Sequence, residues 1–94
     1  MNNSNRNRIC IPKFVRDIAK IKQGEEYYII YETKNNCIFS PIPKGKILGK
    51  VKVIDKGRIF INKNIMEFFE DKRILIYYDY EKELAGVMFL DKDA

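Results

Sequence analysis

Four of the five arginines in this 94-residue chain lie at or next to a motif that occurs twice. The stretch RICIPKFVRDIA, residues 8–19, returns fifty positions later as RIFINKNIMEFF, residues 58–69, with Arg, Ile, Ile and Lys at matching places. The four arginines are Arg6, Arg8, Arg16 and Arg58. A guanidinium group donates paired hydrogen bonds to phosphate oxygens and to guanine edges, so this pattern indicates recognition of a polyanion.

The charge of the chain is concentrated in its first half. Residues 1–47 hold nine Lys or Arg against four Asp or Glu, whereas residues 48–94 hold nine of each. The net charge of +5 therefore belongs to the first half. Such an asymmetry favours a polyanionic partner at one face of the molecule.

Residue types that carry catalysis or bind metals are scarce. The chain has no His and only two cysteines, Cys10 and Cys37, both within apolar runs. It has no Gly-rich phosphate loop and no nucleophile elbow, and its carboxylates are scattered through turns and helix ends. We therefore expect no enzymatic activity, cofactor, metal or small-molecule substrate, and we predict that both cysteines are buried free thiols.

Each copy of the motif predicts a short strand followed by a short helix. RICI and RIFI are β-branched runs, and Pro12 and Asn62 suit the start of a helix after them. Apolar residues then recur at helical spacing, which predicts one buried stripe on each helix. These residues are Phe14, Val15, Ile18 and Ile21 in the first helix, and Ile65, Met66, Phe68 and Phe69 in the second.

A hairpin is predicted after each helix. EYYIIYE and NCIFSPI flank a turn at residues 34–36, where Asn tolerates a positive φ, and RILIYYDY and GVMFL flank a Lys/Glu turn that ends near Gly86. Residues 37–40 match residues 87–90 at the same offset of fifty, so the whole unit is duplicated. We expect one intertwined domain over residues 1–94, with repeats at about 6–42 and 48–90, because a chain of about 45 residues buries too little surface to fold alone.

Between the copies, a Pro/Gly connector leads into an alternating run. Lys50, Val51, Lys52 and Val53 predict a strand with one apolar face and one lysine face. Gly57 precedes Arg58 and Asn7 precedes Arg8. Gly and Asn accept a left-handed backbone most readily, so both arginines are expected to follow a tight reversal.

The stretch VIDKGRIFINKNIMEFF resembles the AbrB/SpoVT family of swapped-hairpin DNA-binding domains, and NRICIPKFVRDIAKIKQGEEYYII resembles the same pattern. In that family two units interlace their hairpins into one two-fold barrel. The resemblance implies a mostly β fold with two short helices, in which the tandem repeats form an intrachain pseudo-dimer, an arrangement similar to MraZ-type proteins. The first copy lacks a leading strand before Arg8, and the second has Asn62 where the family prefers Pro.

The resemblance implies a DNA-contacting set, carried over position by position. Arg8 and Arg58 take the turn role, Lys50 and Lys52 the strand role, and Arg16 the helix role, for which the second helix offers Met66. Lys13 and Lys63 are placed to add phosphate contacts, and a basic arm that includes Arg6 could reach an adjacent groove. The predicted function is a sequence- or shape-selective regulator of transcription that binds double-stranded DNA.

Other interpretations of these residues remain open. The turn arginines could be ordinary surface charges, Arg16 could belong to a solvated helix face, and the tyrosine runs at 27–31 and 77–80 fit core packing better than base stacking. The rival function is a protein-binding module, either antitoxin-like or a phage- or plasmid-encoded inhibitor of a host protein. We expect a cytoplasmic protein with no membrane segment, in which open sheet edges would allow two pseudo-dimers to join into a homo-oligomer.

Overall fold

A computed structural model describes residues 8–61, 63, 65, 67 and 72–91 of the chain. The protein is mostly β, as predicted, and no helix in these ranges is long and apolar enough to cross a membrane. The elements in chain order are β1 (Arg8–Cys10), α1 (Lys13–Ala19), β2 (Glu26–Thr33), β3 (Asn36–Ser40), β4 (Lys46–Lys52), the short 3-10 helix η2 (Asp55–Gly57), β5 (Arg58–Phe60), β6 (Lys72–Asp79) and β7 (Leu84–Asp91).

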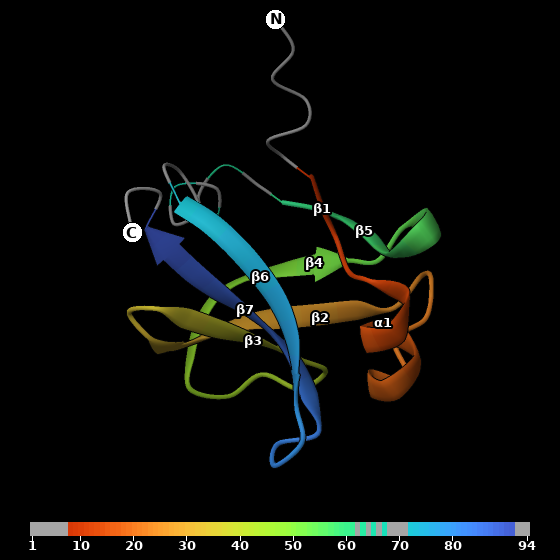
Figure 1. Ribbon diagram of the computed structural model, residues 1–94, viewed down its shortest axis with the longest axis horizontal. Helices are drawn as coiled ribbons and strands as arrows, with labels where there is room; N and C mark the ends of the chain where they lie inside the picture. The colour runs from red at the N-terminus through yellow and green to blue at the C-terminus, as the bar shows by residue number, and fades with distance from the viewer. Residues whose placement is uncertain (1–7, 62, 64, 66, 68–71, 92–94) are drawn as a thin grey trace, which may run out of the picture.

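The strands form two antiparallel sheets (Figure 1). The smaller sheet is a two-stranded ribbon of β1 and β5, and the larger has five strands in the order β4-β2-β3-β7-β6. Helix α1 lies at one end of the larger sheet, next to the turn that contains η2 (Figure 1). Within the described residues neither sheet closes on itself, so the fold has open edges rather than a closed barrel.

Equivalent positions of the two repeats face each other once in each sheet. In the ribbon Ile9 lies opposite Ile59, and in the larger sheet Cys37 lies opposite Val87. In both pairs the partners are fifty residues apart, and both ladders are antiparallel, so each contact has a local two-fold axis that relates one repeat to the other. The fifty-residue offset found in the sequence is thus the offset of the physical contacts.

The hairpins depart from that offset. Phe39 lies opposite Ile29, and its counterpart Phe89 lies opposite Ile74, so β2 and β6 correspond at forty-five residues instead of fifty. The tyrosine runs that match in the sequence consequently have different environments. Tyr27 belongs to the buried core, whereas Tyr77 packs over Gly86, where a Cβ atom would lie 2.6 Å from the tyrosine ring.

A single core joins both sheets to α1. The alternation predicted for residues 50–53 is confirmed, because Val51 and Val53 are buried while Lys50 and Lys52 are exposed. In the ribbon Ile9 and Ile59 are buried as well. Burial of each such aliphatic side chain contributes about 1.5–3 kcal/mol. The core consists of Ile9, Ile11, Val15, Ile21, Tyr27, Ile29, Cys37, Phe39, Val51, Val53, Ile59, Ile61, Ile65, Ala85, Val87 and Phe89.

The apolar stripe predicted for the first helix is only partly buried. Val15 is fully buried, but Phe14 and Ile18 are 63% and 40% exposed. The helix has only seven residues and ends at Lys20, which has a φ of 60°, so Ile21 reaches the core from beyond the helix. Such a short helix has too few turns to cover a wide apolar face.

Part of the predicted second helix can be described. Lys63, Ile65 and Glu67 have helical backbone, and Ile65 is buried as predicted. Its other predicted residues, Asn62, Met66, Phe68 and Phe69, lie outside the described residues, and so does Asn7 before Arg8.

Three local predictions are wrong. Neither Asn35 nor Asn36 has a positive φ, because the Thr33 hydroxyl accepts a hydrogen bond from the Asn35 N–H and closes the turn instead. The second hairpin turn ends before Leu84, which leaves Gly86 inside β7. Cys10 is an exposed free thiol, since it faces away from the core in the ribbon; only Cys37 is buried.

Candidate nucleic-acid interface

The ribbon places the two repeated arginine positions at opposite ends of its antiparallel ladder. Arg8 lies opposite Phe60, and Cys10 lies opposite Arg58. Because side chains alternate along a strand, burial of Ile9 and Ile59 places Cys10, Arg58 and Phe60 on the other side of the ribbon. Cys10 and Phe60 are exposed, and the Arg58 side chain is 38% exposed. The side chains of Arg6 and Arg8 lie outside the described residues.

The turn before Arg58 requires glycine. Lys56 and Gly57 both have left-handed backbone, with φ values of 57° and 78°. A Cβ atom on Gly57 would also lie 2.4 Å from Arg16 Nε and 2.7 Å from the Ile11 carbonyl oxygen. The predicted tight reversal before Arg58 is therefore confirmed, and glycine is needed there both for its backbone conformation and for the close approach of α1.

Backbone hydrogen bonds fix this turn against β1. The Ile54 N–H donates to the Arg58 carbonyl at 2.7 Å, and the Ile11 N–H donates to the Gly57 carbonyl at 2.9 Å. The Cys10 thiol lies 3.5 Å from the Lys56 carbonyl oxygen, within donating distance. The turn of the second repeat is thus attached to the strand of the first.

Arg58 is held by a carboxylate three residues earlier. Its Nη2 donates to both oxygens of Asp55 at 2.6 and 2.7 Å, and its Nε donates to Oδ1 at 3.2 Å. These hydrogen bonds lower the pKa of Asp55 and raise the pKa of Arg58, so both groups stay charged at neutral pH. Asp55 occupies the Nε/Nη2 edge of the guanidinium, and the Nη1 edge retains its donors for another acceptor.

Arg16 reaches the same turn from α1. Its Nε donates to the Ile11 carbonyl at 3.0 Å, and its side chain lies against Gly57. Arg16 and Arg58 therefore lie next to the same glycine, from opposite repeats. The structure brings together the predicted helix arginine and one predicted turn arginine.

The other predicted cations lie on α1, on β4 and after β5. Lys13 pairs with Asp17 on α1 at 3.0 Å, and Lys50 pairs with Glu26 at 3.1 Å while it lies 5.4 Å from the centre of the Tyr28 ring. Exposed pairs of this kind contribute little to stability, so these lysines can exchange partners readily. Lys52 is exposed on β4, and Lys63 is exposed beyond β5.

Three residues near the arginines were not predicted as site residues from the sequence. Asp55 sets the direction of Arg58, Lys56 is an exposed cation at the tip of the turn, and Phe60 lies 56% exposed on the outer side of the ribbon. The spacing of Asp55, Gly57 and Arg58 was the available signal, because an acid three residues before an arginine can pair with it across a tight turn.

The outer side of the ribbon and the adjoining turn form what we call the ribbon site: Cys10, Arg16, Lys56, Arg58 and Phe60. The ribbon site offers hydrogen-bond donors and positive charges around the turn that contains η2, and such groups suit an anionic partner. Comparison with known proteins adds no relative, since no family model, no curated protein and no solved structure matches the chain.

Proposed function

We propose that this protein binds double-stranded DNA through the ribbon site and acts as a regulator of transcription. The observation that carries the proposal is the ribbon with its turn: the register sets the positions of Arg8 and Arg58 at the two ends of one ribbon, and Arg16 lies beside the turn before Arg58. A two-stranded antiparallel ribbon is narrow enough to enter a DNA groove, and guanidinium groups at its two ends suit phosphates and guanine edges.

The fold that we propose is an intrachain pseudo-dimer of the AbrB/SpoVT kind, with exchanged hairpins. Two features support it. The repeats meet at Ile9–Ile59 and at Cys37–Val87, and β4, which leads into the second repeat, pairs with β2 of the first. Each repeat therefore depends on strands from the other, as expected of units that cannot fold alone.

Most of the affinity is expected to be electrostatic. The proposed contacts are Arg6, Arg8, Lys13, Arg16, Lys50, Lys52, Arg58 and Lys63. If about five to seven of these cations neutralise phosphates, log affinity should fall against log salt with a slope of about −0.9 per phosphate. Lys56, at the tip of the turn, is a further candidate.

The test measures binding to a mixed pool of short DNA duplexes at several salt concentrations. The parent protein is compared with Arg8→Ala/Arg58→Ala and with Lys34→Ala/Lys44→Ala, a control that removes two exposed cations from loops distant in sequence from the ribbon. Circular dichroism checks that each variant is folded. We expect micromolar or tighter, salt-steep binding that collapses in the arginine variant and persists in the control.

One observation favours a second candidate function, a module that binds a protein. Phe14, Ile18 and Phe60 are apolar and exposed, at 63%, 40% and 56%. An absence of DNA binding at low salt, or binding that is indifferent to the two arginines, would eliminate the DNA proposal. These three side chains would then be the first to replace in a search for an antitoxin-like or inhibitory contact.

A further inference from the structure

We propose that the outer edge of β6 pairs with β6 of a second copy of this chain, which joins two five-stranded sheets into one continuous sheet. The pairing is antiparallel and two-fold symmetric. It uses no residue of the ribbon site, and it holds whether or not the protein binds DNA.

The two edge strands of the larger sheet differ in how they are protected. Strand β4 carries lysines at positions 46, 50 and 52, and its pairing with β2 is interrupted by a register shift between Ile29 and Ile30. Lysines and irregularities of this kind discourage further pairing at an edge. The edge at β4 is therefore poorly suited to pairing with another strand.

Strand β6 has no register shift, and its one lysine, Lys72, is its first residue. All eight residues from Lys72 to Asp79 pair in continuous register with β7, and the strand contains no Pro or Gly. Among the described residues no strand pairs with its outer edge. A long, regular edge strand is a template for another strand.

The sequence of β6 complements itself in one register. A two-fold axis perpendicular to the sheet pairs residues that share a face, and a centre on Ile76 sets Arg73 opposite Asp79 of the second copy. The same register sets Leu75 opposite Tyr77 and Ile74 opposite Tyr78. A centre on Leu75 would instead set Arg73 opposite Tyr77 and make no charge pair. The register centred on Ile76 therefore gains two opposite-charge pairs, one on each side of the axis.

Apolar surface next to this edge also favours a second copy. Leu75 is 51% exposed, and on the neighbouring strand Met88 and Leu90 are 36% and 42% exposed. Leu75 is the register partner of Met88, so the two share one face of the sheet. Pairing two copies sets Leu75 of each copy beside β6 of the other and so covers part of this apolar surface.

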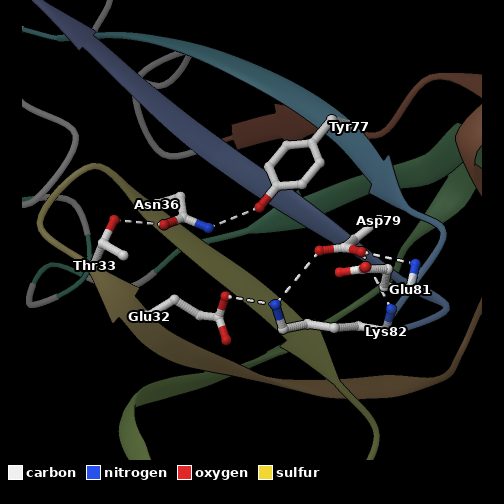
Figure 2. Close-up of polar contacts among 7 residues, drawn as sticks. All are labelled: Glu32, Thr33, Asn36, Tyr77, Asp79, Glu81 and Lys82. Atoms are coloured by element: carbon white, nitrogen blue, oxygen red, sulfur yellow. Dashed lines mark hydrogen bonds and ion pairs between the residues drawn. The ribbon is translucent and has the colours of Figure 1, made fainter.

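The end of β6 is already ordered for such a contact (Figure 2). Asp79 Oδ1 accepts hydrogen bonds from the Glu81 and Lys82 N–H groups at 2.9 and 3.1 Å, and Lys82 Nζ lies 3.2 Å from Glu32 and 3.5 Å from Asp79. Tyr77 accepts a hydrogen bond from Asn36 Nδ2 at 2.8 Å. The Asp79 carboxylate is therefore fixed in position, while the Tyr77 ring leans over β7 toward Asn36 of β3, away from the outer edge.

The test measures the mass of the full chain in solution by analytical ultracentrifugation over about a hundredfold range of concentration, since dimerisation follows mass action. The parent should be a dimer. Arg73→Asp sets two carboxylates opposite each other at both ends of the contact, and Asp79→Lys does the same with cations. Each variant alone should weaken dimerisation at least about tenfold. Lys52→Asp, on the other edge, should leave the mass unchanged.

An equimolar mixture of the Arg73→Asp and Asp79→Lys variants provides the sharper result. In the mixed pair the introduced carboxylate faces the introduced ammonium at one end of the contact, and the native Arg73 faces the native Asp79 at the other. The heterodimer should therefore form although neither variant dimerises well alone. A monomeric parent, a dimer indifferent to Arg73→Asp, or a mixture that does not associate would each overturn the proposal. Should Asp79→Lys fail to fold, the comparison of Arg73→Asp with Lys52→Asp still decides it.

Discussion

The two repeats are alike where they touch each other and different where they face solvent. At the centre of the ribbon Ile9 and Ile59 are both buried, and in the larger sheet Cys37 and Val87 are both fully buried. At the edges of that sheet, β2 of the first repeat is covered by β4, whereas β6 of the second forms an edge. Positions that are buried against each other must keep compatible residue types, whereas the outer edges of the two repeats have no such constraint.

The turn arginines differ in the same way. Three residues before Arg58 is Asp55, which pairs with it, and three residues before Arg8 the chain has Asn5. The neutral charge of the second half and the +5 of the first are thus reflected at the two equivalent arginines. Under the proposed function, the first repeat offers an arginine without a carboxylate at the equivalent position, and the second offers one that is oriented but partly neutralised.

The largest loss of stability is expected from substitutions at the centre of the ribbon, where the two repeats are most alike. Ile59→Ala should lower the free energy of unfolding by about 2–5 kcal/mol, because it removes fully buried methyl groups and leaves a cavity. Ile9→Ala should have a similar cost, since Ile9 occupies the equivalent position. Urea denaturation measures both. Phe60→Ala, at an exposed position of the same ribbon, should change stability by no more than about 0.5 kcal/mol. A large difference between Ile9→Ala and Ile59→Ala would contradict the equivalence.

The next largest effect is expected at the contact between the turn of the second repeat and α1 of the first. Gly57→Ala should lower the free energy of unfolding by about 1–3 kcal/mol. The alanine would have to keep a positive φ, and its Cβ atom would collide with Arg16. Gly24→Ala provides the matched control. Gly24 also has a positive φ, of 93°, but has no atom within 4 Å of the added Cβ. Thermal unfolding of both variants separates the backbone strain from the collision.

Under the proposed function, only Gly57→Ala should also weaken DNA binding, because it displaces Arg16 and the turn that carries Arg58. Equal DNA affinity in the two glycine variants would show that the position of Arg16 does not matter for binding.

Much of this fold could be predicted from alternation and repetition. Val51 and Val53 face the core and Lys50 and Lys52 face solvent because period-two patterning reports directly which face of a strand is buried. The offset of fifty likewise predicted equivalent positions in the two repeats, since only equivalent positions share burial at a two-fold contact.

What could not be predicted depends on backbone geometry that the pattern of residue types does not specify. The forty-five-residue offset between β2 and β6 arises from hairpin registers, and the exposure of Phe14 arises from the early end of α1. The pairing of Arg58 with Asp55 requires the geometry of a turn that includes two left-handed residues, and composition gives no such geometry. At the candidate site, residue types were therefore predictable, whereas their contacts were not.

A smaller change, in DNA affinity, is expected when the surroundings of the two turn arginines are made alike. Asp55→Asn makes the second turn resemble the first, and under the proposed function it should raise DNA affinity several-fold at low salt, because a negative charge leaves the interface. Binding titrations at low and high salt measure the change, with Glu81→Gln as a control that removes an exposed carboxylate from the hairpin turn. Unchanged or weaker binding would indicate that the orientation of Arg58 by Asp55 matters more than its neutralisation.

The smallest perturbation is chemical modification of the two cysteines. Each cysteine occupies a position that is equivalent to an apolar residue of the other repeat. Cys10 corresponds to Phe60, and both are exposed; Cys37 corresponds to Val87, and both are fully buried. Burial raises the pKa of Cys37 to about 11, so at pH 8 it remains a protonated, inaccessible thiol. A thiol reagent should therefore modify one cysteine rapidly in the native protein and the second only in denaturant. Rapid modification of both, with Cys10→Ser as the assignment control, would show that the contact between β3 and β7 opens easily and that the two-fold pairing there is weaker than at the ribbon.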